Sequence, residues 1–189
     1  MVREAVWARL DSSGLEYLRL LDDDAALQAH GTVIGIAEGR PYALTYLLRW
    51  DLRWHVRSLR ADCRSGDRLM TLDLESDGEG RWLRGGQPFT RLHGCFDVDI
   101  AATPFTNTLP IRRLRLNEGD TAEINVAYVD VPELIVEPAR QRYTALAPLA
   151  GNEVYRYESV ESGFCADLSV DLEGLVIDYP PLWRRVVPR

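Results

Sequence analysis

The residues whose types and spacing could do chemistry are concentrated between positions 94 and 115. This stretch carries two carboxylates, one amide and two adjacent guanidinium groups, on Asp97, Asp99, Asn107, Arg112 and Arg113. Arginine pairs bind phosphate or carboxylate through parallel hydrogen bonds, and an asparagine adds neutral donors and acceptors. The same groups could instead neutralise one another and hold the loop between Pro104 and Pro110. Both interpretations, a ligand site and a structural ion cluster, stay open at this point.

Aromatic residues supply a second candidate site. Residues 42–56 alternate between apolar or aromatic side chains and, from Arg49 onward, charged ones, which predicts a strand with one apolar face. The aromatic residues that could line a pocket are Tyr46, Trp50 and Trp54 on this run and Tyr128 on a later strand. Aromatic rings stack on sugar faces and pack along acyl chains, although ordinary core packing is the favoured interpretation for any single ring.

Catalysis has little support in the sequence. The three histidines are scattered, and the motifs GxSxG, HExxH and GxGxxG and the phosphate-binding P-loop are missing. The carboxylate pairs Asp97 with Asp99 and Asp171 with Glu173 would suit glycoside hydrolysis, but acidic pairs on strands are common. We therefore expect no catalytic residue, no metal site and no cofactor. A hydrolase acting on a sugar or lipid headgroup remains an alternative.

Length and charge limit the classes of function. The 189 residues favour a single domain spanning 1–189, long enough to bury a sizeable core. The chain has 29 acidic and 22 basic residues, for a net charge of −7, so neither nucleic acid nor an anionic membrane is an expected partner. Every basic residue is arginine, which excludes Schiff-base and other lysine chemistry. The sequence does not determine the oligomeric state.

The location of the protein is inferred from what its sequence lacks. No window approaches the roughly 20 apolar residues of a membrane span, and the charged N-terminus does not have the pattern of a signal peptide. The cysteines are odd in number and widely spaced, at positions 63, 95 and 165, so we expect reduced, buried thiols and no disulfide framework. A cytoplasmic location is the expectation.

The elements that must position these residues are strands. Short alternating runs separated by turn residues recur along the chain, and no amphipathic helix of normal length is evident. This predicts an all-β fold, a large antiparallel sheet forming a sandwich or an open or half-closed barrel. Residues 42–56 contain no Gly, Pro or Asn, so we expect one long strand bent near Asp51. Arg112 is expected to share a strand face with Leu114 and Leu116.

Two longer-range similarities add to this prediction. Residues 58–82 and 159–179 share an order of Ser, Gly, DLE, Gly and apolar residues, which suggests an internal duplication. Four segments also resemble the bacterial glycolipid-binding family in order and spacing: YLLRWDLRWHVRS (46–58), FDVDIAATPFTNTLPIRRL (96–114), VDVPELIVEPARQRYT (129–144) and DLEGLVIDYPPLWRR (171–185).

The resemblance implies an incompletely closed β-barrel, similar to lipoprotein carriers, that binds a glycolipid in its concave face. The exported carriers have an export signal, and this chain shows none. We therefore expect a small amphipathic ligand, with the strand aromatics holding its apolar part. Asn107, Arg112 and Arg113 would meet its polar part. The alternatives are the hydrolase described above and a protein–protein interaction module that uses the concave sheet or an exposed edge.

Overall fold

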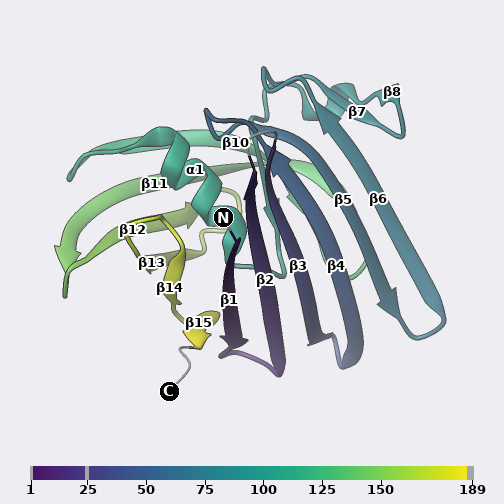
Figure 1. Ribbon diagram of the computed structural model, residues 1–189, viewed down its shortest axis with the longest axis horizontal. Coiled ribbons are helices and arrows are strands. Elements are labelled where there is room, and N and C mark those ends of the chain that lie inside the picture. The colour runs from purple at the N-terminus through teal and green to yellow at the C-terminus, as the bar shows by residue number, and fades with distance from the viewer. Residues whose placement is uncertain (1, 24–25, 187–189) are drawn as a thin grey trace.

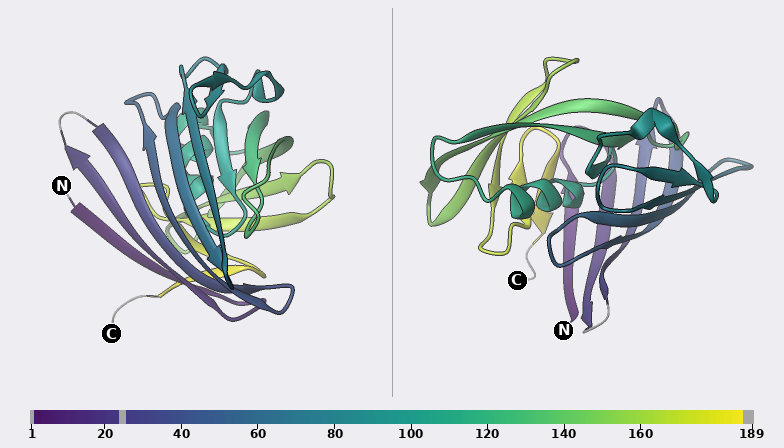
Figure 2. Two further views of the ribbon diagram at one scale, coloured as in Figure 1. Left: turned by 90° about the vertical axis from the view of Figure 1, so that its right-hand side faces the viewer. Right: turned by 90° about the horizontal axis from the view of Figure 1, so that it is seen from above.

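Fifteen strands form one sheet that bends into two halves in the computed structural model, which describes residues 2–23 and 26–186 (Figures 1 and 2). The first half contains β1 (Val2–Arg9), β2 (Gly14–Asp23), β3 (Ala26–Ala37), β4 (Arg40–Trp50), β5 (Val56–Ser65), β6 (Arg68–Ser76), β7 (Trp82–Arg84) and β8 (Gln87–Pro88). The second half contains β9 (Asp97–Ile100), β10 (Thr121–Val129), β11 (Val136–Leu149), β12 (Asn152–Ser159), β13 (Cys165–Val170), β14 (Val176–Tyr179) and β15 (Trp183–Val186).

The strand order explains why the sheet stays open. Within each half, strands that follow one another in the chain lie side by side, and β1 pairs with β15 to join the halves. The free edges are β8 and β9, which are consecutive in sequence but do not pair within the described residues. All pairs are antiparallel except β9 with β10. The prediction of an all-β, mainly antiparallel, open architecture is confirmed.

The expected internal duplication stays a prediction. Residues 58–82 cover β5 to β7, and residues 159–179 cover the end of β12, β13 and β14. Each segment is an antiparallel meander, and the shared order of turn residues and apolar residues is common to meanders in general.

The prediction of one long strand over residues 42–56 is wrong. β4 ends at Trp50 and β5 begins at Val56, and these two residues are partners across a hairpin. Asp51 makes the turn possible, because its Oδ1 accepts the backbone N–H groups of Arg53 (2.9 Å) and His55 (3.0 Å). An aspartate side chain can thus build a turn without Gly, Pro or Asn. Trp54 takes a positive φ of 67° in this turn.

The expected strand through Arg112, Leu114 and Leu116 is also wrong. A 3-10 turn, η2 (Phe105–Asn107), continues into a helix, α1 (Thr108–Leu114); another short turn, η1 (Thr90–Leu92), lies between β8 and β9. Pro110 falls in the first turn of α1, where a missing N–H leaves no helical hydrogen bond unmade. A helix of seven residues is too short to show a clear helical period in the sequence.

The segment containing η2 and α1 covers the concave side of the sheet. Figures 1 and 2 show α1 lying between the two halves. Phe105 and Leu109 are completely buried there, within the same core as Trp7 on β1 and Leu48 on β4. The inner face of the curved sheet is therefore largely filled by the protein's own chain.

Two glycines in β3 make room for aromatic rings of β4. Gly31 lies opposite Tyr46, and Gly35 lies opposite Tyr42. A Cβ atom at Gly31 would be 2.0 Å from Cε1 of Tyr46, so only glycine lets the Tyr46 ring lie across the backbone of β3. This packing directs the Tyr46 hydroxyl into the core.

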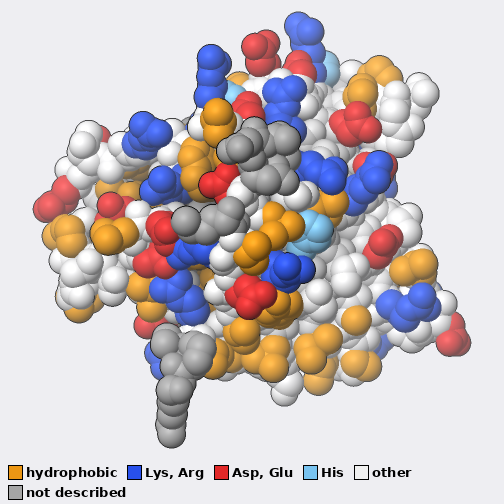
Figure 3. Space-filling view, viewed as in Figure 1, with side chains coloured by type: hydrophobic (Ala, Val, Ile, Leu, Met, Phe, Trp, Pro, Cys, Tyr) orange, Lys and Arg blue, Asp and Glu red, His pale blue; other side chains and the backbone are white. Residues whose placement is uncertain are grey.

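The surface carries both signs of charge. Figure 3 shows arginine and acidic side chains interspersed across one face, with apolar side chains gathered below, over the lower ends of β1 to β4. The described part of the chain contains no helix with the length and apolar character needed to span a membrane. All three cysteines are free; Cys63 and Cys95 are buried as expected, but Cys165 is exposed because its side chain points outward from β13.

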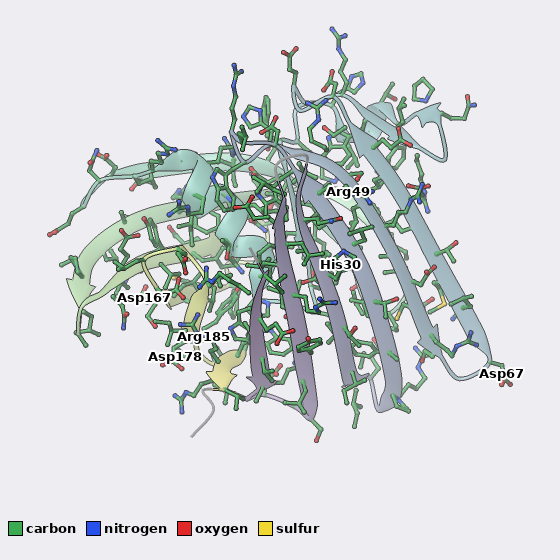
Figure 4. All side chains as sticks on the ribbon, in the orientation of Figure 1. His30, Arg49, Asp67, Asp167, Asp178 and Arg185 are labelled. Carbon is green, nitrogen blue, oxygen red and sulfur yellow. The ribbon has the colours of Figure 1, made fainter. Side chains whose placement is uncertain are left out.

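The Asp51 turn gives a first prediction. Replacing Asp51 by Ala should lower the free energy of unfolding by about 1–2 kcal/mol, because two backbone N–H groups lose their acceptor. Asp51→Asn should lose less, since an amide oxygen can accept both. Urea denaturation measures the difference. Asp67→Ala, at the exposed tip of the β5–β6 hairpin (Figure 4), is the control, and an equal loss there would contradict the prediction.

Candidate functional site

A cavity of about 560 Å³ lies on the concave side, between the second half of the sheet and the segment that carries η2. Its aromatic lining residues are Tyr128, Tyr157, Phe164, Tyr179 and Trp183. Asp99, Thr103 and Asn107 add polar groups from the covering segment and β9, and the exposed Glu137 and Glu161 lie at its rim. The cavity therefore combines aromatic walls with a few polar groups, as small-molecule sites commonly do.

Three rings form one wall of this cavity. The ring centroids of Tyr157 and Tyr179 are 6.0 Å apart, and Phe164 lies 6.1 Å from Tyr157 and 6.3 Å from Tyr179. The planes are inclined to one another by 50–66°. The rings thus present a mixture of faces and edges to the cavity.

Two tyrosine hydroxyls of the cavity lining have no protein partner in the described part of the chain. Tyr157 is 5% exposed and Tyr179 is 7% exposed, yet neither hydroxyl makes a hydrogen bond within the described residues. Burial raises the pKa of both hydroxyls, so both remain neutral donors. The buried side-chain polar atom without a partner among the described residues is Trp50 Nε1, so the two tyrosine hydroxyl oxygens remain accessible from the cavity. A molecule in the cavity can accept a hydrogen bond from each of them, and each such bond contributes about 0.5–1.5 kcal/mol.

Asp99 supplies the carboxylate of the cavity. Its Oδ1 accepts from the Thr106 hydroxyl at 2.9 Å, and its Oδ2 accepts from the Gln141 amide at 2.6 Å. Burial raises the pKa of Asp99, and only these two neutral groups oppose the rise. The charge of Asp99 is therefore hydrogen-bonded but not compensated by a cation.

Asp97 has the opposite arrangement. Its carboxylate is completely buried and forms a bidentate pair with Arg113, with Nε to Oδ1 at 3.1 Å and Nη2 to Oδ2 at 2.5 Å. Burial raises the pKa of Asp97 despite the neighbouring guanidinium. Arg113 also lies over the ring of Phe96, 5.9 Å from its centroid. Asp97 and Arg113 satisfy each other and fasten α1 to β9.

Trp50, Trp54 and Arg112 meet in a separate cavity of about 240 Å³ on the other side of the covering segment. The two indoles are stacked with centroids 5.7 Å apart, and the Arg112 guanidinium lies 5.2 Å from the Trp54 centroid. Arg112 also donates to the backbone oxygen of Leu172 at 3.3 Å. The Trp50 indole N–H has no hydrogen-bond partner within the described residues.

Tyr46 lines neither cavity and instead binds a buried glutamate that the sequence reasoning missed. The Tyr46 hydroxyl donates to Oε1 of Glu16 at 2.6 Å, and the Thr103 hydroxyl donates to both carboxylate oxygens at 2.8 and 2.6 Å. Glu16 is 0% exposed, and burial raises its pKa from 4.5 to about 7. Glu16 lies two residues before Leu18 on the same face of β2. This spacing was the sequence signal that the Glu16 side chain would be buried.

The predicted site residues are therefore distributed over four places: the larger cavity, the smaller cavity, the Tyr46–Glu16 contact and the Asp97–Arg113 pair. Asp99, Asn107 and Tyr128 come together in the larger cavity, where Asn107 is held by the Tyr143 hydroxyl at 2.8 Å. The sequence reasoning missed the other four aromatic lining residues, Tyr157, Phe164, Tyr179 and Trp183. Alternation predicts strands, but it does not show which side chains of separate strands meet at one cavity.

This chain is similar to known proteins in sequence and in structure. A family model described as "Putative glycolipid-binding" matches residues 4–185. The chain belongs to this family. It is also similar to the crystal structure of a DUF1089 family protein from Pseudomonas aeruginosa, with 45% identity, 93% of each chain covered and a TM-score of 0.85. No curated protein matches the chain.

The buried Glu16 predicts a pH-dependent stability for this family member. Because its folded pKa is raised, protonated Glu16 stabilises the fold fully below pH 4.5, and this contribution disappears as the pH rises to about 7. Relative to wild type, Glu16→Gln should therefore gain about 3 kcal/mol of unfolding free energy over that window. Urea denaturation at several pH values tests this. Glu4→Gln, on the exposed face of β1, should run parallel to wild type.

The two arginines of α1 should differ in their effect on stability. Arg113→Ala leaves the Asp97 carboxylate buried without a cation and should lower the free energy of unfolding by about 3–5 kcal/mol. Arg112→Ala loses a partly exposed contact with Trp54 and should lower it by about 1 kcal/mol. The double variant Asp97→Asn/Arg113→Ala should recover part of the unfolding free energy that Arg113→Ala loses. Equal effects of the two single variants would contradict the structural role of Arg113.

Proposed function

We propose that the protein binds a small amphipathic ligand, a glycolipid in the first instance, in the cavity lined by Asp99, Tyr128, Tyr157 and Tyr179. The observation that carries the proposal is an aromatic-walled cavity that Tyr157 and Tyr179 line, with hydroxyls that are accessible and have no hydrogen-bond partner within the described residues. Accessible hydroxyls without a protein partner are free to hydrogen-bond a molecule that enters the cavity.

The chemistry of the lining suits a sugar. Sugar C–H faces pack on aromatic rings, as the inclined rings of Tyr157, Phe164 and Tyr179 allow. Sugar hydroxyls can donate to Asp99 and accept from the tyrosine hydroxyls. The volume of about 560 Å³ falls within the roughly 300–1,000 Å³ usual for ligand sites. Apolar contacts from Leu182 and Trp183 would adjoin the less polar part of the ligand.

Binding is favoured over hydrolysis for a specific reason. A glycoside hydrolase needs a second carboxylate that is free to act opposite the first. Of the expected pair, Asp99 lines the cavity but Asp97 is engaged by Arg113. The carboxylates at the rim are engaged as well, Glu137 with Arg91 at 2.8 Å and Glu161 with Arg140 at 2.9 Å.

Titration with n-octyl β-D-glucoside below its micellar concentration tests the proposal by calorimetry. The wild-type protein should bind it, and a Tyr157→Phe/Tyr179→Phe variant should bind about tenfold more weakly, because two hydrogen bonds are lost while both rings remain. Tyr155→Phe is the matched control. Tyr155 lies on the same face of β12, but its hydroxyl donates to Glu153 and it does not line the cavity.

Two results would contradict the proposal. One is the absence of saturable binding by the wild-type protein. The other is equal affinity in the wild-type protein, the double variant and the Tyr155 control, which would place any binding outside the cavity.

A further inference from the structure

We propose that the polar group received at Asp99 is cationic, an ammonium group such as that of an amino sugar or a choline-like head. This assignment rests on the binding function proposed above and specifies the charge of its ligand. It is carried by the combination of a half-buried carboxylate without a cationic partner and inclined aromatic faces in one cavity.

The charges of the lining are all of one sign. Asp99, Glu137 and Glu161 line the cavity, and no arginine, lysine or histidine does so within the described part of the chain. Glu137 and Glu161 are exposed at the rim, where surface arginines neutralise them. The charge left inside the cavity is that of Asp99.

Asp99 lacks the partner that Asp97 has. Thr106 and Gln141 donate neutral hydrogen bonds to it, and burial raises its pKa. Asp99 is half-buried, and a carboxylate removed in part from water is stabilised by a nearby cation and destabilised by a nearby anion. The site therefore favours a positively charged ligand group over a neutral one, and a neutral one over phosphate, sulfate or carboxylate.

The aromatic residues strengthen this preference. The faces of aromatic rings are electron-rich and attract ammonium groups within about 6 Å of the ring centroid. Tyr157, Phe164 and Tyr179 provide three inclined rings, and Tyr128 on β10 lies directly beside Asp99 on β9 as its Cα partner. A carboxylate next to several aromatic rings is an arrangement that suits an ammonium group.

The arginines that could have selected an anion are used elsewhere. Arg113 is bound to Asp97, and Arg112 lies over Trp54 in the smaller cavity. Neither lines the cavity that contains Asp99. The two guanidinium groups of α1 are therefore separated from the proposed ligand site.

Two matched pairs of small probes test the charge preference by calorimetry or ligand-observed NMR. They are glucosamine against glucose, and choline against its neutral carbon isostere 3,3-dimethylbutan-1-ol. In at least one pair the charged member should bind the wild-type protein about tenfold more tightly. Asp99→Asn keeps the size and hydrogen-bonding capacity of the side chain and should remove that difference. The control is Asp167→Asn, on the surface of β13 and paired with Arg156 (Figure 4), which should keep it.

The outcomes separate the two proposals. Equal or weaker binding of the charged member in both pairs, or no binding of either charged probe, would overturn the cationic assignment while leaving octyl glucoside binding to stand or fall independently. A charge preference that survives in Asp99→Asn would also overturn it. The wild-type comparison needs no variant, so the test remains decisive if Asp99→Asn does not fold.

Discussion

The structure depends on how an open, curved sheet covers its inner face. A small closed barrel can fill its interior with strand side chains alone, whereas this fifteen-stranded sheet ends at β8 and β9 and leaves a concave side. The chain covers that side with the segment containing η2 and α1. Backbone and polar side chains of a buried segment need partners, and they find them at fixed points: Thr103 binds Glu16, Asn107 binds Tyr143, and Arg113 binds Asp97.

The segment containing η2 and α1 divides the concave side into two separate spaces. One cavity remains beside the second half of the sheet, and a smaller one remains beside Trp50 and Trp54. A single continuous hollow, as a simple carrier of long lipids would need, is replaced by two separate spaces with the covering segment between them. The size of each space limits the part of a ligand that it can enclose, so the proposed site encloses a headgroup and the adjoining atoms rather than a whole lipid.

The chemistry of the larger cavity follows from which polar groups the covering segment leaves without partners. Asp97 and Asp99 are two residues apart, yet one has a guanidinium and the other has only neutral donors. The tyrosine hydroxyls of β12 and β14 are left free in the same space. The shared fold of the Pseudomonas aeruginosa structure, at 45% identity, establishes the architecture. The ligand preference is argued from these side chains.

The sequence by itself determined the strands, because side chains alternate along a strand and the alternation is legible over a few residues. It also predicted Asp99, Asn107 and Tyr128 as candidate site residues, and the tertiary structure brings these three to one cavity. It could not show the turn at Asp51 or the helix α1, since each depends on contacts of side chain with backbone or on burial that a short pattern does not reveal. Tertiary structure alone decided which groups met: Glu16 with Thr103, and the tyrosines of β12 and β14 with Asp99 at one cavity. Those pairings join residues far apart in the chain, and local periodicity contains no information about them.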